Sequence, residues 1–274
     1  MDDRTPIERP PRQLAAPALA AQIFALDFRR RFRARSFWIL LAALCFPAAV
    51  AAIQVATGSL SADYLTALVD AAVLPFLVPL AALFLGGPTI IDEVEGQTLT
   101  YLTLRPIPRG LLFIAKLASS LSLALIAVLG SLGLLTVVGV IGGHPPSPST
   151  LAHLFASAAL GALAYTALFA TLGVLFSATL LPGIVYFVVF EVIFFAIPLL
   201  ELLSVKFHLH IVAGLDPTGA ADDDTGGLRG LLEQLLLDAP LELAPWHSAL
   251  VILAVTPAFI LAGALLFERR QFHH

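Results

Sequence analysis

The chain has 274 residues, of which 59% are hydrophobic and only 12% are charged, with a formal net charge of −4. Together with a mean hydropathy of +0.93, these values exclude a soluble protein of ordinary composition, which must cover its surface with charge. The apolar runs are about 20 residues long or longer and do not alternate with polar residues, as barrel strands would. The expected fold class is therefore an all-α membrane protein, and no nucleic-acid partner is expected.

The N-terminal region precedes the first apolar run. Residues 1–17 combine several prolines with charged residues, which predicts a disordered cytoplasmic leader. In residues 18–35, Phe24, Phe28 and Phe32 recur every four residues, and five arginines crowd the positions between Phe28 and Ser36. This pattern predicts an amphipathic interfacial helix along the inner leaflet.

Two arginines fall close to this phenylalanine stripe. Arg31 and Arg35 would have to extend toward lipid headgroups if the helix lies in the interface. A basic arm that is merely solvated is the alternative interpretation. The single cysteine, Cys45, lies inside the first apolar run and is interpreted as a small core residue.

About six transmembrane helices are predicted within residues 36–274. The third run exceeds what a bilayer needs, so its first turns, with Lys116, are expected to lie below the bilayer in the cytoplasm. Residues 204–247 are too polar to span and are predicted to form a small extracellular cap. The predicted spans are Ser36 to Thr57, Ala71 to Ile91, Leu111 to Ile141, Leu151 to Phe176, Gly183 to Leu203 and Ser248 to Phe267.

Charge distribution predicts the orientation of these helices. With the N-terminus inside, all but two of the 15 lysine and arginine residues fall on one side, and only Lys206 and Arg229 fall on the other. The positive-inside rule then predicts that both termini are cytoplasmic, in a multi-pass protein of the bacterial inner membrane.

Sites for hydrolytic chemistry are missing from the sequence. The lysines, Lys116 and Lys206, do not stand in a Gly-Lys-Ser or Gly-Lys-Thr loop, so any ATP must be hydrolysed by a separate subunit. The histidines do not form a zinc-protease motif, and His208 and His210 are a weak metal pair at best. We therefore expect no enzymatic activity, no cofactor and no metal in this chain.

One ionisable residue, Glu191, stands in the middle of the fifth predicted span. A carboxyl group is costly in lipid, so Glu191 should face the bundle or a cavity. It is either a contact for a proton or a substrate, or a structural carboxyl that joins helices.

A polar segment at 92–110 separates the second and third predicted spans. Acidic residues and Gly96 should end one helix, and residues 97–104 can form about two helical turns that Pro106 then ends. Leu99 and Leu102 lie on one side of this short helix. Such a helix is suited to receive force from a soluble partner, whereas an ordinary loop on the membrane is the alternative.

The same segment resembles a known family. Its sequence, Glu-x-Glu-Gly-Gln-Thr-Leu-x-x-Leu-x-x-Arg-Pro-Ile-Pro-Arg, is similar to the cytoplasmic element of ABC-2 type permeases, and weaker similarity continues to residue 272. The resemblance implies a type V-like exporter fold in which this element is a coupling helix seated on an ATPase. The coupling residues that it implies are Glu93, Glu95, Gly96, Thr98, Leu99, Leu102, Arg105 and Arg109.

The resemblance also implies the partners. We expect a cytoplasmic ABC ATPase subunit, a second permease in a homodimer or heterodimer, and membrane lipid. The expected function is the permease subunit of an exporter that works by alternating access. An ATP-independent, proton-linked carrier or a membrane enzyme that uses Glu191 is the alternative.

Overall fold

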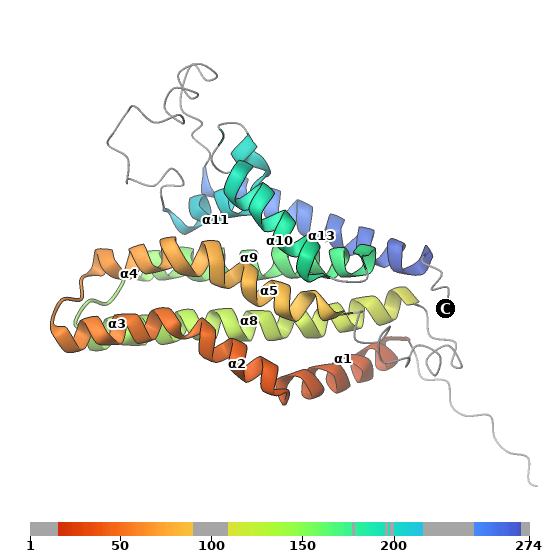
Figure 1. Cartoon of the computed structure of the whole chain (residues 1–274), viewed down its shortest axis with the longest axis horizontal. Helices are drawn as coiled ribbons and strands as arrows, with labels where there is room; N and C mark the ends of the chain where they lie inside the picture. Colours follow the sequence, from red (N-terminus) through yellow and green to blue (C-terminus); the bar gives the residue numbers. More distant parts are fainter. Residues whose placement is uncertain are drawn as a thin grey trace, which may run out of the picture.

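The computed structural model describes residues 16–89, 109–176, 179–194, 197, 200–215 and 244–269. Within these residues every regular element is a helix (Figure 1). The elements are α1 (Ala16–Phe32), α2 (Arg35–Leu44), α3 (Phe46–Thr57), α4 (Ala62–Leu68), η1 (Val69–Leu77), α5 (Val78–Gly86), α8 (Arg109–Ile141), α9 (Pro148–Phe176), α10 (Leu180–Tyr186), η2 (Phe187–Ile193), η4 (Leu200–Leu203), α11 (Val205–Ala213) and α13 (Pro245–Arg269).

Several of the described helices can cross a membrane. Four are long and apolar enough, namely Ala62–Gly86, which joins α4, η1 and α5, and the single helices α8, α9 and α13. A fifth span results if α2 and α3 are taken together, since they are separated by a bend of 41°. The bend falls at Cys45, where α3 begins with Pro47 near its N-terminus. The prediction of an all-α, multi-pass membrane protein is confirmed.

The second span begins earlier than predicted. It starts at Ala62 rather than Ala71, and Ser61 caps it by accepting a hydrogen bond from the Tyr64 backbone N–H at 3.1 Å. The polar residues of this first part, Asp63 among them, hid the helix from a search for apolar runs. The serine is the helix-start signal that the sequence contained.

The fifth predicted span, Gly183 to Leu203, is not one continuous helix. The apolar helix runs through α10 and η2 and ends at Ile193, and the 3₁₀ turn η4 starts at Leu200. The sequence has Pro198 between them, and proline supplies no N–H for a helical ladder. At 7 residues each, α10 and η2 reach about 21 Å at most, less than the ~30 Å hydrocarbon core.

In the part of the chain that the structure describes, η1 and η2 are wound as π-helix. Pro75 lies inside η1 and cannot donate a backbone hydrogen bond, and at the end of the segment the Val78 N–H bonds to the Val73 carbonyl, five residues back. Wide turns of this kind are frequent at functional positions. Glu191 lies in the second of them, η2.

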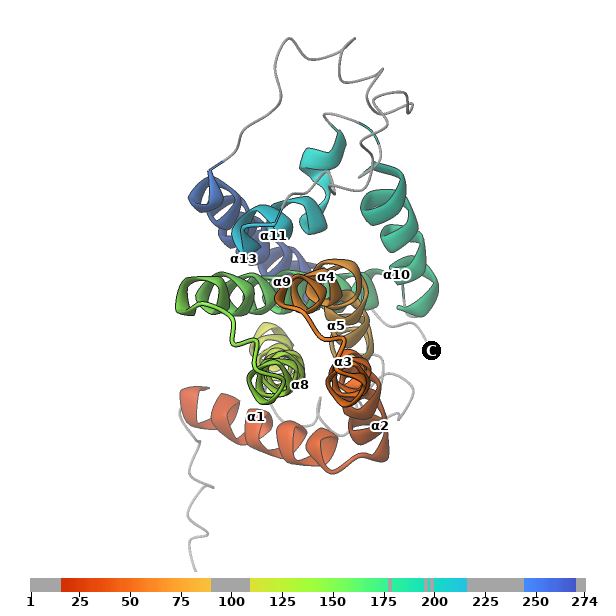
Figure 2. The ribbon, with the colours of Figure 1, turned by 90° about the vertical axis from the view of Figure 1, so that its left-hand side faces the viewer.

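The centre of the bundle is α9. In its most apolar window 67% of the residues are buried, against 22% for α13. Figure 2 shows α9 between a layer containing α3 and α8 and a layer containing α11 and α13, with α1 lying across the long axis of α8. Figure 1 shows α1 and the C-terminal end of α13 at the same end of the bundle.

Part of the segment predicted as an extracellular cap is a buried helix. In α11, Phe207, Leu209 and Val212 pack against α9 and α13, and residues 216–243 lie outside the described residues. The α9 face that receives α11 carries small residues. Ser157 Oγ donates to the Leu209 carbonyl at 2.7 Å, and a side chain at Gly161 would lie 2.7 Å from Leu209 Cδ1.

Candidate coupling site and the charge cluster at its base

The predicted coupling residues fall mostly outside the described part of the chain. Arg109 is the first residue of α8 and is exposed. The structure describes the elements on either side of residues 90–108, which are the end of α5 with Pro88 and Thr89, and the start of α8. The coupling residues outside the described part are Glu93, Glu95, Gly96, Thr98, Leu99, Leu102 and Arg105.

A buried charge cluster joins these two elements to α1. We name it the Arg31 cluster, and it consists of Asp27, Arg31, Lys116 and Ser120. Arg31 Nε lies 3.0 Å from Asp27 Oδ2, one turn earlier on α1. Its Nη1 donates to the Leu85 carbonyl at 3.0 Å and to Ser120 Oγ at 3.2 Å. One guanidinium therefore ties α1 to the end of α5 and to α8.

The charged groups of the Arg31 cluster are paired within the protein, Asp27 with both Arg31 and Lys116. Asp27 is 6% exposed, Arg31 9% and Lys116 3%, and Lys116 Nζ lies 3.9 Å from Asp27 Oδ1. Buried charges are tolerated when they are paired and hydrogen-bonded. Arg31 also donates to the Pro88 carbonyl at 3.4 Å, so a cation lies where the α5 dipole is negative. The prediction that Arg31 extends outward is wrong, because Asp27 and these carbonyls hold it inside.

The opposite side of the α5 end is held by close backbone contacts. Thr179 Oγ1 donates to the Gly87 carbonyl at 2.9 Å. A Cβ at Gly173 of α9 would lie 2.5 Å from that same carbonyl oxygen, and a Cβ at Gly86 would lie 2.8 Å from the Thr166 carbonyl oxygen. Only glycine permits this approach, so the end of α5 is fixed between the Arg31 cluster and α9.

The start of α8 is packed against the end of α13. A Cβ at Gly110 would lie 2.5 Å from Glu268 Oε1. Phe113 and Phe267 are both buried, with ring centroids 6.3 Å apart. Thus α1, α5, α8 and α13 all meet at the end of the bundle where residues 90–108 connect α5 to α8.

Glu191 lies among hydrogen-bond donors. Its carboxylate accepts from Ser204 Oγ at 2.6 Å, from Tyr186 OH at 3.0 Å, and from the backbone N–H groups of Val205 and Lys206 at 3.3 and 3.0 Å. Glu191 is 3% exposed. The two N–H groups open α11, so the carboxylate caps that helix and lies at the positive end of its dipole.

The histidines of α11 use their ring nitrogens within the protein. His210 Nδ1 lies 2.8 Å from the Lys206 carbonyl, and Nε2 lies 3.0 Å from Asp70 Oδ1 in η1. His208 lies 3.0 Å from the Leu202 carbonyl and 3.1 Å from Ser248 Oγ. Burial lowers the pKa of His208, which favours a neutral ring. All four nitrogens have protein partners, so the pair joins helices instead of sharing a metal.

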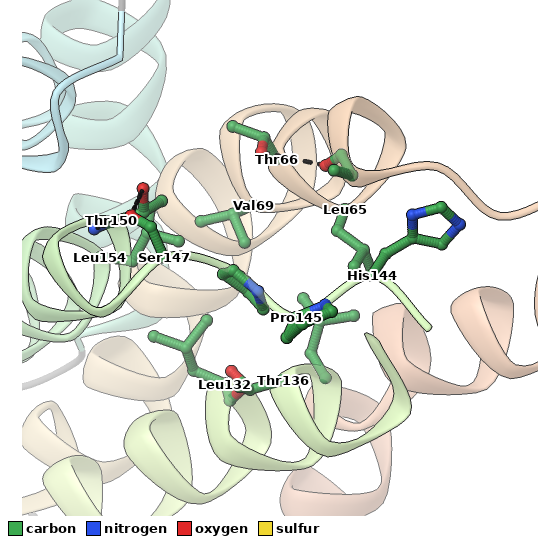
Figure 3. A pocket seen from close by; sticks show the side chains of 13 residues that line it. Leu65, Thr66, Val69, Leu132, Thr136, His144, Pro145, Ser147, Thr150 and Leu154 are labelled. Carbon is green, nitrogen blue, oxygen red and sulfur yellow. Dashed lines mark hydrogen bonds between the residues drawn. The ribbon is translucent and has the colours of Figure 1, made fainter. Parts of the chain in front are cut away.

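A cavity of about 180 Å³ lies at the other end of the bundle, between α4, the end of α8 and the start of α9. Figure 3 shows Leu65, Val69 and Leu132 around it, together with threonine and serine hydroxyls. Thr66 Oγ1 already donates to the Ala62 carbonyl at 3.1 Å. Among its described lining residues only His144 has a side chain of an ionisable type, so the cavity offers little chemistry.

Sequence reasoning missed most of the residues that build these contacts. Asp27 and Arg31 are spaced i, i+4, the spacing of an ion pair on one helix face, and this signal was present in the sequence. Ser204 precedes an apolar run and is the expected type of helix cap. The pairing of Glu191 with α11 left no local signal, because it joins residues 13 to 15 positions apart.

A family comparison agrees with this architecture. The model of the family described as ABC-2 family transporter protein matches residues 29–204. That match covers more than half of the 274 residues, from α1 to the residue that caps α11. The chain belongs to the ABC-2 transporter family, and it is a membrane permease component of an ABC transporter. No curated protein matches the chain at a significant level.

Proposed function

We propose that the chain forms the substrate path of an ABC transporter and takes its energy from a separate cytoplasmic ATPase that binds residues 92–110. The coupling residues are Glu93, Glu95, Gly96, Thr98, Leu99, Leu102, Arg105 and Arg109. The observation that supports this proposal most is the Arg31 cluster, which joins α1, the end of α5 and α8 through buried hydrogen bonds. A push on residues 92–110 would therefore move three helices together.

The proposal includes the topology. The six transmembrane helices are α2 with α3, Ala62–Gly86, α8, α9, the α10–η2 helix and α13. The α10–η2 helix is short, and α11, which η4 joins to it, continues the chain along α9 and α13. An interfacial α1 and cytoplasmic termini are supported by the position of α1 and the α13 end at one end of the bundle (Figure 1). Residues 204–247 would then lie at the exterior end of the protein, with α11 packed inside the bundle against α9 and α13.

The proposal also includes the assembly. Two such permeases, identical or similar, pair with each other and with two ATPases in the bacterial inner membrane, and the complex exports its substrate. In physical terms the ATPase must favour one permease conformation over the other, because equal binding to both shifts nothing. The low burial of α13, 22% in its apolar window, leaves a face that lipid or a second permease can cover.

The proton-linked alternative has less support. A proton relay needs a carboxyl group that can release and regain its proton during transport. Four donors already hydrogen-bond to the carboxylate of Glu191, two to each of its oxygens, so both oxygens are committed to partners within the protein. We therefore assign Glu191 to the joining of η2 and α11.

Two substitutions within residues 92–110 test the coupling proposal. Leu102→Asp and Arg105→Glu should lower ATPase retention on the tagged, purified permease, together with its ATP turnover. Truncating a central interface contact typically costs about 1–4 kcal/mol, so a loss of tenfold or more is expected for Leu102→Asp. Arg105→Glu should act through repulsion of an acidic partner surface.

The control is Asp63→Arg, a charge reversal in the first turn of α4, at the other end of the bundle. It should insert normally and keep wild-type ATPase retention. If Leu102→Asp and Arg105→Glu also insert normally and keep both readouts, residues 92–110 are not the coupling element. Absence of any ATPase on the wild-type permease would favour the ATP-independent alternative instead.

A further inference from the structure

The ring of His210 in α11 faces two hydrogen-bond acceptors. Its Nδ1 lies 2.8 Å from the Lys206 carbonyl oxygen, and its Nε2 lies 3.0 Å from Asp70 Oδ1 in η1. A carbonyl and an ionised carboxylate accept hydrogen bonds and cannot donate them. A neutral ring has a single N–H, so one of its lone pairs would face one of these oxygens. The pair of His210 and Asp70 therefore holds one proton more than a neutral ring and an ionised carboxylate contain.

His208, two residues earlier on the same helix, has no such requirement. Its Nε2 lies 3.0 Å from the Leu202 carbonyl oxygen, and its Nδ1 lies 3.1 Å from Ser248 Oγ. A hydroxyl can donate as well as accept, so a neutral ring with its proton on Nε2 satisfies both partners. The two histidines of α11 thus differ in the number of protons that their surroundings require.

From this contrast we propose that His210 and Asp70 form a proton-dependent joint between α11 and the second span, Ala62–Gly86, which the bound proton closes and its release opens. The proton lies on the ring, because imidazole is a much stronger base than a carboxylate. Once it leaves, a lone pair and a negative oxygen face each other at 3.0 Å. Asp70 Oδ1 is buried and receives no other hydrogen bond from the residues that the structure describes.

The joint can exchange its proton with the surroundings. The side chain of Asp70 is 37% exposed, whereas that of His210 is 4% exposed, so Asp70 is the accessible member of the pair. Burial lowers the pKa of His210, and the Lys206 carbonyl and Asp70 oppose this effect only in part. The proton is therefore held less tightly than on an exposed histidine, and a rise in pH releases it.

Of the ionisable groups around His210, Asp70 and Lys206 are the two that act on the ring. Asp70 favours the charged ring, and Lys206 disfavours it because it is a cation. Glu191 uses both carboxylate oxygens for hydrogen bonds at the start of α11. The other ionisable residues described on α11 and on the elements packed against it are His208, Glu201 on η4, His153 and Tyr165 on α9, and His247, Glu268 and Arg269 on α13.

The segment that carries Asp70 is able to bend. It is the π-helix η1, and Pro75 lies inside it, five residues after Asp70. Prolines and π-turns are the usual causes of bends in helices. η1 continues directly into α5, which leads to residues 90–108. Release of Asp70 from His210 would therefore free the second span to bend relative to α11.

The protonation of His210 can be measured directly. The purified full chain, labelled with ¹⁵N-histidine, is titrated in detergent micelles between about pH 5 and pH 8, and the His210 signal is assigned by its loss in His210→Gln. We expect a charged ring at the acid end and a neutral ring at the alkaline end. Asp70→Asn should lower the pKa of His210 by about 1 or more, because it removes the opposite charge at 3.0 Å.

Two spin labels report the opening of the joint. In a Cys45→Ser background they are attached at Ala67 in the second span and at Leu203, just before α11, which are both exposed. The distance between the labels should lengthen as the pH rises. In Asp70→Asn it should stay at its acid value, because the amide can donate to a neutral ring at every pH. His208→Gln is the matched control and should keep the response of the parent protein.

Several outcomes would overturn the proposal. One is a His210 ring that stays neutral over the whole titration, and another is an equal lengthening in the parent and in Asp70→Asn. A His210 ring that titrates while the label distance stays constant would show a static pair with no joint. Loss of the response in a folded His208→Gln would assign it to the packing of α11 in general. If His208→Gln fails to fold, the comparison of the parent with Asp70→Asn still decides.

Discussion

The carboxylate of Glu191 accepts four hydrogen bonds. Two come from the backbone N–H groups that open α11, and two from the hydroxyls of Ser204 and Tyr186. A buried carboxylate in this setting satisfies a helix terminus that would otherwise be left with unpaired N–H groups. Its energetic contribution therefore lies in the docking of α11 on the bundle.

Glu191→Gln should destabilise the protein by about 1–3 kcal/mol, because the amide nitrogen would face a donor and leave it unpaired. The measurement is thermal unfolding in detergent micelles. Tyr186→Phe removes one donor and keeps the ring, so a smaller loss is expected from it. Normal unfolding of Glu191→Gln combined with abolished transport would contradict the structural assignment and restore the proton carrier.

Glu191 and Arg31 also show how much of these contacts could be predicted from the sequence. The polarity of Glu191 and its depth in an apolar run indicated that it should face protein. The partners of Glu191 could not be predicted from the sequence, because Ser204 lies 13 positions away and meets the carboxylate only in the folded protein. The same holds for Arg31, whose acceptors on α5 and α8 lie 54 and 89 positions away.

At the scale of elements, the close contact between α5 and α9 depends on glycines, which have no side chain to separate the two backbones. The Gly87 carbonyl oxygen lies 2.5 Å from the position that a Cβ at Gly173 would occupy. In a bilayer such close approach replaces the hydrophobic effect as a source of helix association. The backbone of α5 has no room to yield, because the Arg31 cluster holds its other side.

Gly173→Ala should therefore destabilise the protein by about 1–3 kcal/mol through overpacking. Gly130→Ala in α8 is the matched control, since nothing lies within 4 Å of its added methyl group. That substitution should be neutral or stabilising by up to about 1 kcal/mol, because alanine favours a helix. Equal melting temperatures for the two variants would show that α5 and α9 are not held by this contact.

Element boundaries were predictable where apolar residues dominate. The helices α8, α9 and α13 contain the third, fourth and sixth predicted spans with few residues added at either end. The start of the second span was missed because Asp63 and Asp70 interrupt the apolar run. Asp63 is exposed in the first turn of α4, and Asp70 is compensated by an ion pair with His210.

At the scale of the whole molecule, the prediction concerns sidedness. Reporters fused after His274 and within residues 1–17 should both indicate the cytoplasm, and a reporter at Asp223 should indicate the exterior, because nearly all lysines and arginines fall on one side. Enzymatic reporters that are active on only one side of the membrane provide the measurement. An external C-terminus would exclude the six-span topology.

The membrane-spanning helices differ in how much of their surface is buried within the chain. A majority of the apolar window of α9 is buried, while most of that of α13 is not. A helix with so little cover must meet lipid or another subunit over most of its surface. The match to the family model ends at residue 204, before α13 begins.

The large sequence separation between Arg31 and its partner on α8 implies an order in which the helices dock during synthesis. Ser120 follows Arg31 by 89 residues, so at about 5–20 residues per second it leaves the ribosome about 4 to 18 s later. During that interval Ser120 does not yet exist, so the only acceptors on other helices that Arg31 can reach are the Leu85 and Pro88 carbonyls at the end of α5. The first described helix to be synthesised therefore completes its docking only after α8 has been made. A ribosome stalled after Pro88 but before Ser120 would leave α1 without its contact to α8, and we expect α1 to be more open to protease than in the full chain.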